Sequence, residues 1–475
     1  MPEPRSTGAR KTNIAAALGL CASLLLSTTA VQAADKTSWG SYYKPFAATS
    51  PWNSRPVQPA FGDFVIPKST YSPGVAGGEW STGVFLAKPG DAPVTVSGLP
   101  KTQGLWDPDA SAFHDVTIPR WPAEVVAASA SDGHADIVDP QTGIVHSFWQ
   151  LKKIDGKWVA AQYAWTRLNG RGWGDPAHYF QGARAAGVAT AGGLIRKHEV
   201  NDGDVMYRHA LALSLTYNAL SAKPTYIFPA SSADTDAATT NKGKIPEGAL
   251  LMLPPNYDTS KISNPDLRKV AETLKTYGAY VVDRNFGTPF FIYVENGAGF
   301  DLHKGGWNKT VADDLERMRV ALRQVVSAQS WLDGNGKPVQ LQKKMNLLSM
   351  RGPWQLQAGD QLAPFDTWLQ AVKFPASAQR VTQVNYSSRG LHPVSWALPQ
   401  SGKNYRVSAR TTGGGTLRVQ VRDPSGTPLY FDSGELTQGE SRTFAWPDPR
   451  AIVTVYASSG AGTASTVSGE LLELE

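Results

Sequence analysis

The stretch "DVMYRHALALSL", Asp204 to Leu215, combines an apolar alternation with two polar rings. If it is a strand, its odd positions share one face, because side chains alternate along a strand. Tyr207 and His209 then lie on an otherwise apolar face, about 7 Å apart, while Arg208 points the other way. Spacing alone leaves open whether the two rings act on a ligand or are hydrogen-bonded within a core.

Short alternating segments flank this stretch and are separated by Gly, Pro and Asp signals, which is typical of antiparallel sheets. The strongest hairpin signal is Asp155-Gly156, which lies between two strand-like runs. Helical spacing occurs in two segments, 264–278 and 310–331. Few helices among many strands, without regular βα alternation, argue against a parallel α/β sheet.

We therefore predict a mainly β protein. Residues 34–335 are predicted to form the main domain, a jelly-roll or β-sandwich that includes the few helices. The alternation loosens in 336–375, which we interpret as a linker or extension. The short, evenly spaced strands of 376–475 predict a small C-terminal β-sandwich, which we expect to bind carbohydrate or stabilise the protein rather than to catalyse.

The first 33 residues have the pattern of a secretory signal peptide, with a basic start, the apolar run "IAAALGLCASLLLSTTA" and small residues ending at Ala33. The apolar run is short for a bilayer and no stop-transfer charges follow, which disfavours a transmembrane anchor. Cys21 is the only cysteine and lies within this segment, so the mature chain would hold no disulfide. We expect a secreted or periplasmic protein without a membrane anchor.

The composition narrows the class of partner. A net charge of +6 without dense Lys/Arg runs is not typical of a nucleic-acid binder. The 15 Trp, 16 Tyr, 45 Gly and 33 Pro favour short strands joined by turns, and exposed aromatic rings are surfaces on which sugars stack. We expect a monomer whose partner is a polysaccharide, acidic in view of the basic balance, although ordinary surface charge explains that balance equally well.

The sequence contains no GxSxG, HExxH or Walker motif, so no standard motif identifies a catalytic residue. Tyr207 and His209 are the first candidates for catalysis. Removing the proton next to a uronic-acid carboxylate needs a base, an acid for the departing oxygen and a cation that neutralises the carboxylate. Tyr207 and His209 suit the base and the acid. Arg196 or Arg208 suits the cation.

Two carboxylates offer a second kind of chemistry. Asp132 alternates with His134 and Asp136 in "SDGHADIVD", which suits an acid/base pair or a metal site, although its Asp-Gly step is also a plain turn signal. Glu199, in "GGLIRKHEVNDGD", suits the general acid of a glycoside hydrolase, although the segment also fits a short capped helix. No calcium-loop pattern is present, so we expect no metal or other cofactor.

Aromatic and basic residues in loops are candidates for sugar binding, although surface packing explains them equally well. They occur in the Gly-rich loop "NGRGWGDPAHYFQG", in "SMRGPWQ", in the segment around Glu199 and after the SDG segment. These substrate-binding candidates are Arg196, Trp149, Trp173, His178, Tyr179, Arg351 and Trp354.

Four blocks carry a resemblance to a family. "SDGHADIVDPQTGIVHSFWQ", "AGGLIRKHEVNDGDVMYRHALAL", "IPEGALLML" and "TYGAYVVD" resemble blocks that recur in this order in an uncharacterised family of secreted bacterial β-rich proteins. The resemblance covers about residues 50–300 and implies a carbohydrate-active protein without supplying a reaction. It points to Asp132, Glu199 and His209 as the motif-bearing polar positions, and Tyr207 falls where the family varies.

Three functions follow from these patterns. The leading hypothesis is a polysaccharide lyase that cleaves an acidic glycan by β-elimination, with Tyr207, Arg208 and His209 at the site. The second is a glycoside hydrolase that uses Glu199 and Asp132. The third is a non-enzymatic glycan-binding or envelope protein.

Overall fold

The computed structural model describes residues 36–357, 362–363, 368, 370–385, 391 and 394–475. The predicted signal peptide at 1–33 therefore lies outside the described residues. Across the described residues the chain is mainly β, with three α-helices and a C-terminal β-sandwich, so the predicted fold class is confirmed. No helix in these ranges has the length and apolar character needed to cross a membrane.

The largest sheet has eight strands and mixes parallel with antiparallel pairs. Its order is β1-β17-β14-β15-β13-β16-β2, and β18 pairs with β17. The strands are β1 (Arg55–Phe61), β2 (Gly74–Ala76), β13 (Leu211–Thr216), β14 (Leu250–Met252), β15 (Ala279–Asn285), β16 (Phe290–Tyr293), β17 (Arg323–Leu332) and β18 (Pro338–Val339).

Strand β13 lies inside this sheet and is buried on both faces. Leu211, Leu213 and Leu215 pack in one core with residues of α2 and α3, whereas Ala212 belongs to the core on the opposite face. The alternation predicted for the three leucines is therefore confirmed, because odd and even positions of the strand enter different cores.

The strand begins at Leu211, so the prediction that it already includes residues 205–210 is wrong. Val205 is 69% exposed. The backbone N–H of Tyr207 donates to Oγ1 of Thr273 on α2 rather than to a neighbouring strand. Strand pairing starts only where the parallel partner starts, with Leu211 opposite Ala279.

The helices are α1 (Ala237–Thr240), α2 (Pro265–Thr276) and α3 (Lys309–Ala321). Asn264 and Asn308 cap α2 and α3, because their side-chain oxygens accept the backbone N–H three residues on. The helix predicted at 310–331 ends at Ala321, and the rest of that segment forms β17, which pairs antiparallel with β1. Sheet pairing overrides the helical spacing there.

Two smaller sheets form from the segment that precedes β13. One has the order β10-β11-β4-β7 and the other β3-β8-β9-β12-β5-β6, and a separate hydrophobic core draws residues from both sheets. Their strands are β3 (Gly83–Leu86), β4 (Val94–Gly98), β5 (Trp106–Asp107), β6 (Ala112–Phe113), β7 (Val116–Ile118), β8 (Ala135–Asp139), β9 (Ile144–Trp149), β10 (Lys152–Ile154), β11 (Lys157–Ala160) and β12 (Gln162–Arg167).

The C-terminal part is a sandwich of two sheets, ordered β20-β19-β22-β27-β24-β25 and β21-β28-β23-β26. Its core already includes Leu347 and Leu348, so part of the segment predicted as a linker packs within the sandwich. The strands are β19 (Trp354–Leu356), β20 (Leu362–Ala363), β21 (Val372–Phe374), β22 (Thr382–Asn385), β23 (Asn404–Thr412), β24 (Thr416–Arg422), β25 (Leu429–Asp432), β26 (Ser441–Ala445), β27 (Ile452–Ser458) and β28 (Ser465–Glu473).

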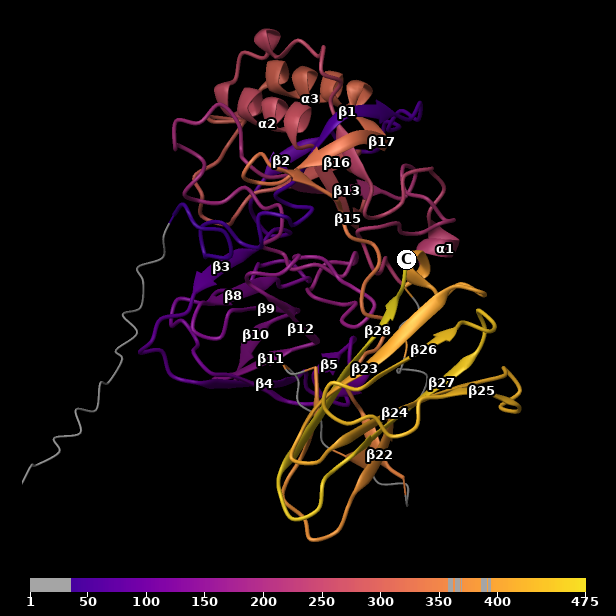
Figure 1. Cartoon of the computed structure of the whole chain (residues 1–475). Coiled ribbons are helices and arrows are strands. Elements are labelled where there is room, and N and C mark those ends of the chain that lie inside the picture. Colours follow the sequence, from indigo (N-terminus) through magenta and orange to yellow (C-terminus); the bar gives the residue numbers. More distant parts are fainter. Residues whose placement is uncertain (1–35, 358–361, 364–367, 369, 386–390, 392–393) are drawn as a thin grey trace, which may run out of the picture.

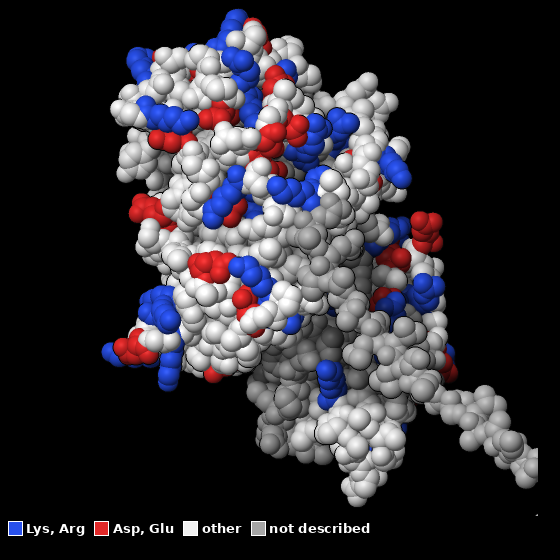
Figure 2. Space-filling model, turned by 90° about the vertical axis from the view of Figure 1, so that its left-hand side faces the viewer, with Lys and Arg blue, Asp and Glu red and all other residues white. Residues whose placement is uncertain are grey.

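Figure 1 shows how these parts are stacked. Helices α2 and α3 lie on one face of the eight-stranded sheet, the sheet containing β3, β8, β9 and β12 lies beyond the other face, and the C-terminal strands lie beside them. A second core, which includes Trp52 and Trp173, fills the space between the first two sheets. Basic and acidic side chains are interspersed on the face seen in Figure 2.

The predicted hairpin at Asp155-Gly156 is confirmed and allows a test of its backbone conformation. Asp155 and Gly156 join β10 to β11 with φ values of 47° and 78°. We expect Gly156→Ala to destabilise the protein by about 1 kcal/mol, because a Cβ disfavours this φ. Gly90→Ala is the matched control, because a Cβ at Gly90 or at Gly156 would meet no atom within 4 Å and only Gly156 has a positive φ. Equal urea midpoints for the two variants would contradict the assignment.

Candidate functional site

A groove of about 420 Å³ lies between β12, the loop that follows it and the C-terminal sandwich. Its volume falls within the range of small-ligand sites. Strand β12 contributes Trp165 and Arg167, and the loop contributes several polar side chains. The lining consists of Trp165, Arg167, Gly170, Arg171, Asp175, Ala177, His178, Gln181, Met345, Asn346, Gln370, Glu470 and Leu472.

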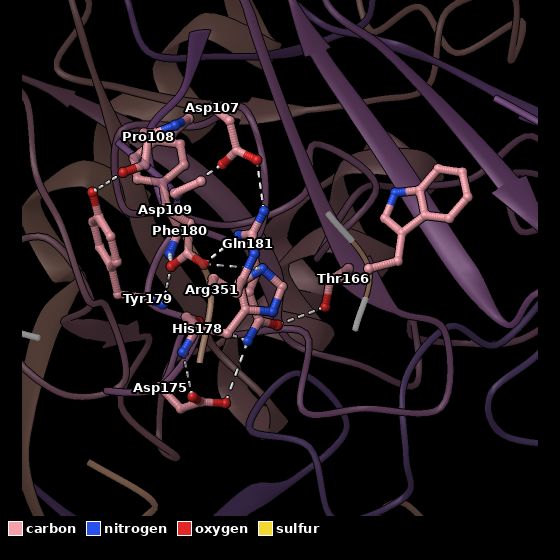
Figure 3. A network of polar contacts seen from close by, with 12 residues as sticks. Asp107, Pro108, Asp109, Thr166, Asp175, His178, Tyr179, Phe180, Gln181 and Arg351 are labelled. Carbon is pink, nitrogen blue, oxygen red and sulfur yellow. Dashed lines mark hydrogen bonds and ion pairs between the residues drawn. The ribbon is translucent and has the colours of Figure 1, made fainter. Parts of the chain in front are cut away.

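A buried ion-pair network lies beside this groove (Figure 3). The guanidinium of Arg351 lies between two carboxylates, donating from Nη2 to Oδ2 of Asp107 at 2.6 Å and from Nη1 to Oδ2 of Asp109. Burial acts to raise the pKa of Asp107, but Arg351 and His114 outweigh it and hold that pKa at about 2. Arg351 therefore joins the start of the C-terminal sandwich to the end of β5 and to the turn that follows it.

Asp109 also fixes the loop that carries the groove residues. Its Oδ1 accepts the backbone N–H of Tyr179 at 2.7 Å, and the Tyr179 hydroxyl donates to the carbonyl of Pro108 at 2.5 Å. These contacts hold the loop against the turn that follows β5. The loop conformation and the Arg351 ion pairs therefore depend on the same carboxylate.

Asp175 lies in the groove and is held by its own loop. Its Oδ1 accepts the backbone N–H of His178 at 2.8 Å, and its Oδ2 is 3.4 Å from Nε2 of Gln181. Oε1 of Gln181 accepts from Oγ1 of Thr166 at 2.7 Å, which fixes the amide orientation. Burial raises the pKa of Asp175 to about 6, with a contribution from the Asp109 charge. This carboxyl therefore changes charge near neutral pH.

His178 packs between the groove and the ion-pair network. Its ring centroid lies 4.2 Å from that of Trp165. Burial, with the charge of Arg351, lowers its pKa well below the usual value, so the imidazole is neutral. Its Nε2 lies 3.9 Å from Oδ2 of Asp109 and has no hydrogen-bond partner among the described residues.

Arg171 is a half-buried cation, and two of its donor atoms are buried without a hydrogen-bond partner among the described residues. Its Nη1 donates to the carbonyl of Gln342 at 2.8 Å, whereas Nε and Nη2 have no hydrogen-bond partner within the described ranges. Burial lowers its pKa, and the nearby charge of Asp175 acts in the opposite direction without reversing the shift. Two adjacent free N–H donors on a guanidinium match the geometry of a carboxylate.

The structure brings together three of the predicted substrate-binding residues, His178, Tyr179 and Arg351. The two tryptophans predicted with them lie in cores instead. Trp173 stacks on Trp52 with 4.5 Å between centroids, and Trp354 donates from Nε1 to the carbonyl of Met350.

Sequence reasoning missed Asp175, Arg171, Gln181, Trp165, Asp107 and Asp109 at this site. The first three lie in or beside the Gly-rich loop that the sequence had indicated. The signal that could have identified these three residues is the presence of polar side chains in a loop that is rich in aromatic residues.

Glu199 and His209, which were predicted for different reactions, lie together at a second, smaller cavity. Nε2 of His209 is 3.3 Å from Oε2 of Glu199, and Nδ1 donates to the carbonyl of Ala210 at 2.8 Å. Burial acts to lower the pKa of His209 and to raise that of Glu199, but their mutual attraction reverses both shifts and holds the Glu199 pKa at about 2. Nε2 is therefore engaged in an ion pair with Glu199 and Nδ1 in a hydrogen bond to the backbone.

The cavity beside this pair measures about 40 Å³, which is room for a few water molecules but not for a sugar ring. The segment from Trp39 to Phe46 contributes much of its lining. Arg196, which also borders the cavity, donates from Nε to Oε2 of Glu295 at 2.8 Å and is buried. A catalytic role for Glu199, His209 and Arg196 stays a prediction.

Tyr207 and Arg208 lie on opposite sides of this segment. Tyr207 is 2% exposed and packs in the core with α2, where Nζ of Lys269 lies 4.6 Å from its ring centroid. Arg208 is exposed and pairs with Asp204. Tyr207 does not line the cavity beside His209, although the centroids of the two rings lie 6.4 Å apart.

Asp132 and Trp149 contact each other in a third place, where Nε1 of Trp149 donates to Oδ1 of Asp132 at 3.1 Å. Burial raises the pKa of Asp283 to about 7, and the nearby charge of Asp132 adds to this rise. Nη1 of Arg184 lies 3.3 Å from Oδ2 of Asp283. Within the part of the chain that the structure describes, no group of three or more His, Cys, Asp or Glu side chains is arranged to hold a metal ion.

Removing Arg351 tests the ion-pair network. Arg351→Met leaves Asp107 and Asp109 buried without their cation, so we expect a loss of about 3–5 kcal/mol of stability. Arg450→Met is the matched control, because the Arg450 side chain is 79% exposed and pairs with Asp448 at the surface, where an ion pair contributes little to stability. Thermal unfolding measures both, and equal midpoints would contradict a network that supports the fold.

Asp175→Asn tests the raised pKa. The folded pKa of about 6 lies above the usual value of 3.8, so the wild type loses stability as pH rises from about 4 to 6, whereas the amide variant does not. We expect the variant to be more stable than the wild type above pH 6 by on the order of 2 kcal/mol, with no such gain at pH 4. Thermal unfolding at both pH values measures this. Glu124→Gln, at an exposed side chain, is the control, and a pH-independent difference would refute the assignment.

Comparisons with known proteins give only weak similarities. No family model and no curated protein matches the chain. Accessory secretory protein 1, 2 and 3 of Streptococcus pneumoniae is 12% identical with a TM-score of 0.18, over 29% of this chain and 99% of that chain. The enzymatically active domain of tailspike protein 4 of bacteriophage CBA120 is 11% identical with a TM-score of 0.19, over 27% and 22%. A glycosylation-associated protein complex of Streptococcus agalactiae is 14% identical with a TM-score of 0.16, over 26% and 44%. Similarity at this level carries no conclusion about activity.

Proposed function

We propose that the protein is a secreted polysaccharide lyase, which cleaves an acidic, uronate-containing glycan by β-elimination in the 420 Å³ groove. The observation that carries this proposal is the presence, in one groove, of Arg171 with two free donors and of Asp175 with a pKa of about 6. Such a pair supplies a carboxylate-binding cation and a base that is ionised at neutral pH.

Arg171 is suited to bind the uronate carboxylate. Its Nε and Nη2 donors are unpartnered among the described residues, and its Nη1 is held by the Gln342 carbonyl. A carboxylate that accepts both donors would add a direct ion pair to the longer-range attraction that Asp175 exerts on this guanidinium. Neutralising the carboxylate also acidifies the hydrogen on the adjacent carbon, which is the proton removed in β-elimination.

Asp175 is suited to be the base. In its ionised form it takes the proton from the carbon next to the carboxylate. The electron pair forms a carbon–carbon double bond while the bond to the glycosidic oxygen breaks, and the proton passes from Asp175 to the departing oxygen. No water is consumed. His178 and Gln181 orient Asp175 through the backbone N–H of His178 and the Gln181 amide, so they are positioning residues.

Incubation with polygalacturonate, polymannuronate and polyguluronate tests the reaction. We expect ultraviolet absorbance from unsaturated uronides, and product masses lower by one water than those of hydrolysis. The kcat/KM of the wild type should rise with pH through about 6, because Asp175 must be ionised. Asp175→Asn should lower kcat by about 10²–10⁴-fold.

The same experiment separates the alternatives. A hydrolase would use protonated Asp175 as the acid, so its activity would fall as pH rises through about 6, and its products would contain added water. It would also need a second groove carboxylate, so Glu470→Gln would abolish its activity, whereas the lyase retains activity in that variant. Binding of the polymers without any product over long incubation would establish a non-enzymatic glycan-binding protein.

A further inference from the structure

Two further cavities border the segment that connects β18 to the C-terminal sandwich. One measures about 460 Å³ and the other about 200 Å³, and Lys343 lines both of them. Met345 lines both the smaller of these cavities and the groove that contains Asp175. The three hollows therefore follow one another along a single stretch of chain, residues 339–347.

A stack of two cations on one aromatic ring joins the groove to the 460 Å³ cavity. The guanidinium of Arg171 and Nζ of Lys343 each lie 5.2 Å from the ring centroid of Phe228. Arg171 lines the groove, whereas Phe228 and Lys343 line the 460 Å³ cavity. Phe228 is itself fixed by Trp396 of the C-terminal part, whose ring meets it edge-on at 5.1 Å.

The charges along this path are unequally compensated. Within the described part of the chain, Arg167, Arg171 and Lys343 pack on aromatic rings and form no ion pair. The acidic residues Glu470 and Glu473, by contrast, are paired with Arg410 at 2.7 Å and with Lys344 at 3.0 Å. The path therefore presents three cations without a direct ion pair, of which Arg171 is attracted by Asp175 at longer range, while two of its carboxylates are already neutralised.

The 460 Å³ cavity adds an elongated surface next to these cations. Consecutive residues of β17, from Val325 to Trp331, form one side of it, and Leu250 and Tyr280 contribute apolar surface. A row of consecutive strand residues suits an extended ligand rather than a compact one, because the row advances about 3.3 Å per residue. Charge and shape therefore favour the same class of ligand, an extended polyanion.

We propose that an acidic oligosaccharide chain runs from the groove past the stack of Arg171, Phe228 and Lys343 into the 460 Å³ cavity, so that Lys343 binds a carboxylate outside the unit that is cleaved. This inference rests on the proposed function and specifies its substrate as a polymer that contacts the protein over several sugar units. Lys343 is then a specificity-determining residue for chain length, whereas Arg171 and Asp175 act on the cleaved unit.

Substrates of different length test this path in the full chain. For polymeric uronate, Lys343→Ala should raise KM by about tenfold, the effect of losing one charge-assisted contact, and should leave kcat unchanged. For a disaccharide or trisaccharide of the same uronate, KM should not change. Lys157→Ala is the matched control, because Lys157 is exposed at the hairpin of β10 and β11 and lines none of the three cavities.

Affinity electrophoresis in gels that contain the same polymers gives a second readout that needs no turnover. We expect the acidic polymers, but not neutral dextran, to retard the wild type and Lys157→Ala, and to retard Lys343→Ala less. Equal retardation of the two variants, or an equal loss on short and long substrates, overturns the path while the lyase reaction stands. Retardation that depends on Lys343, without cleavage of any uronate, overturns the proposed reaction while the path stands.

Discussion

The guanidinium of Arg351 between Asp107 and Asp109 is the contact on which the groove depends. Two buried carboxylates cannot stay ionised beside each other without a cation, and this cation comes from a residue about 240 positions further along the chain. The same Asp109 holds the loop that carries Asp175 and His178. The groove is thus a consequence of domain packing: the C-terminal part supplies Met345, Asn346 and Leu472 as its far wall.

The local sequence pattern was sufficient to predict the elements whose conformation depends only on residues close in the sequence. The Asp155-Gly156 hairpin needs only two residues with positive φ, and α2 needs an Asn cap and an apolar stripe. The alternation of Leu211, Leu213 and Leu215 is visible in the sequence because each face of β13 enters a different core. The segment 322–331 was mistaken for helix because its strand partner, β1, is more than 260 residues away and leaves no local signal.

The candidate site was harder to predict for the same reason. Asp175 is one acid in a turn-rich loop, and its pKa is raised because burial and Asp109 surround it, neither of which the loop sequence reveals. Arg171 has two buried donors without a partner among the described residues, where several other arginines have one, and this is a property of the folded chain. His178, Tyr179 and Arg351 could be selected from composition, but the sequence did not indicate that Arg351 would reach the loop from the C-terminal part.

Two of the places that hold a carboxylate and a histidine are poised in opposite ways. Glu199 and His209 stabilise each other's charge, so the Glu199 pKa falls to about 2 and the pair has little tendency to exchange a proton near neutral pH. Asp175 and His178 do not pair through their side chains: burial raises the first pKa and lowers the second, so both groups are close to neutral in slightly acidic solution. A proton-transfer site needs the second arrangement, because the charged and neutral forms must be close in energy. A stable ion pair instead fixes the chain, and at Glu199 it fixes the turn that leads into β13.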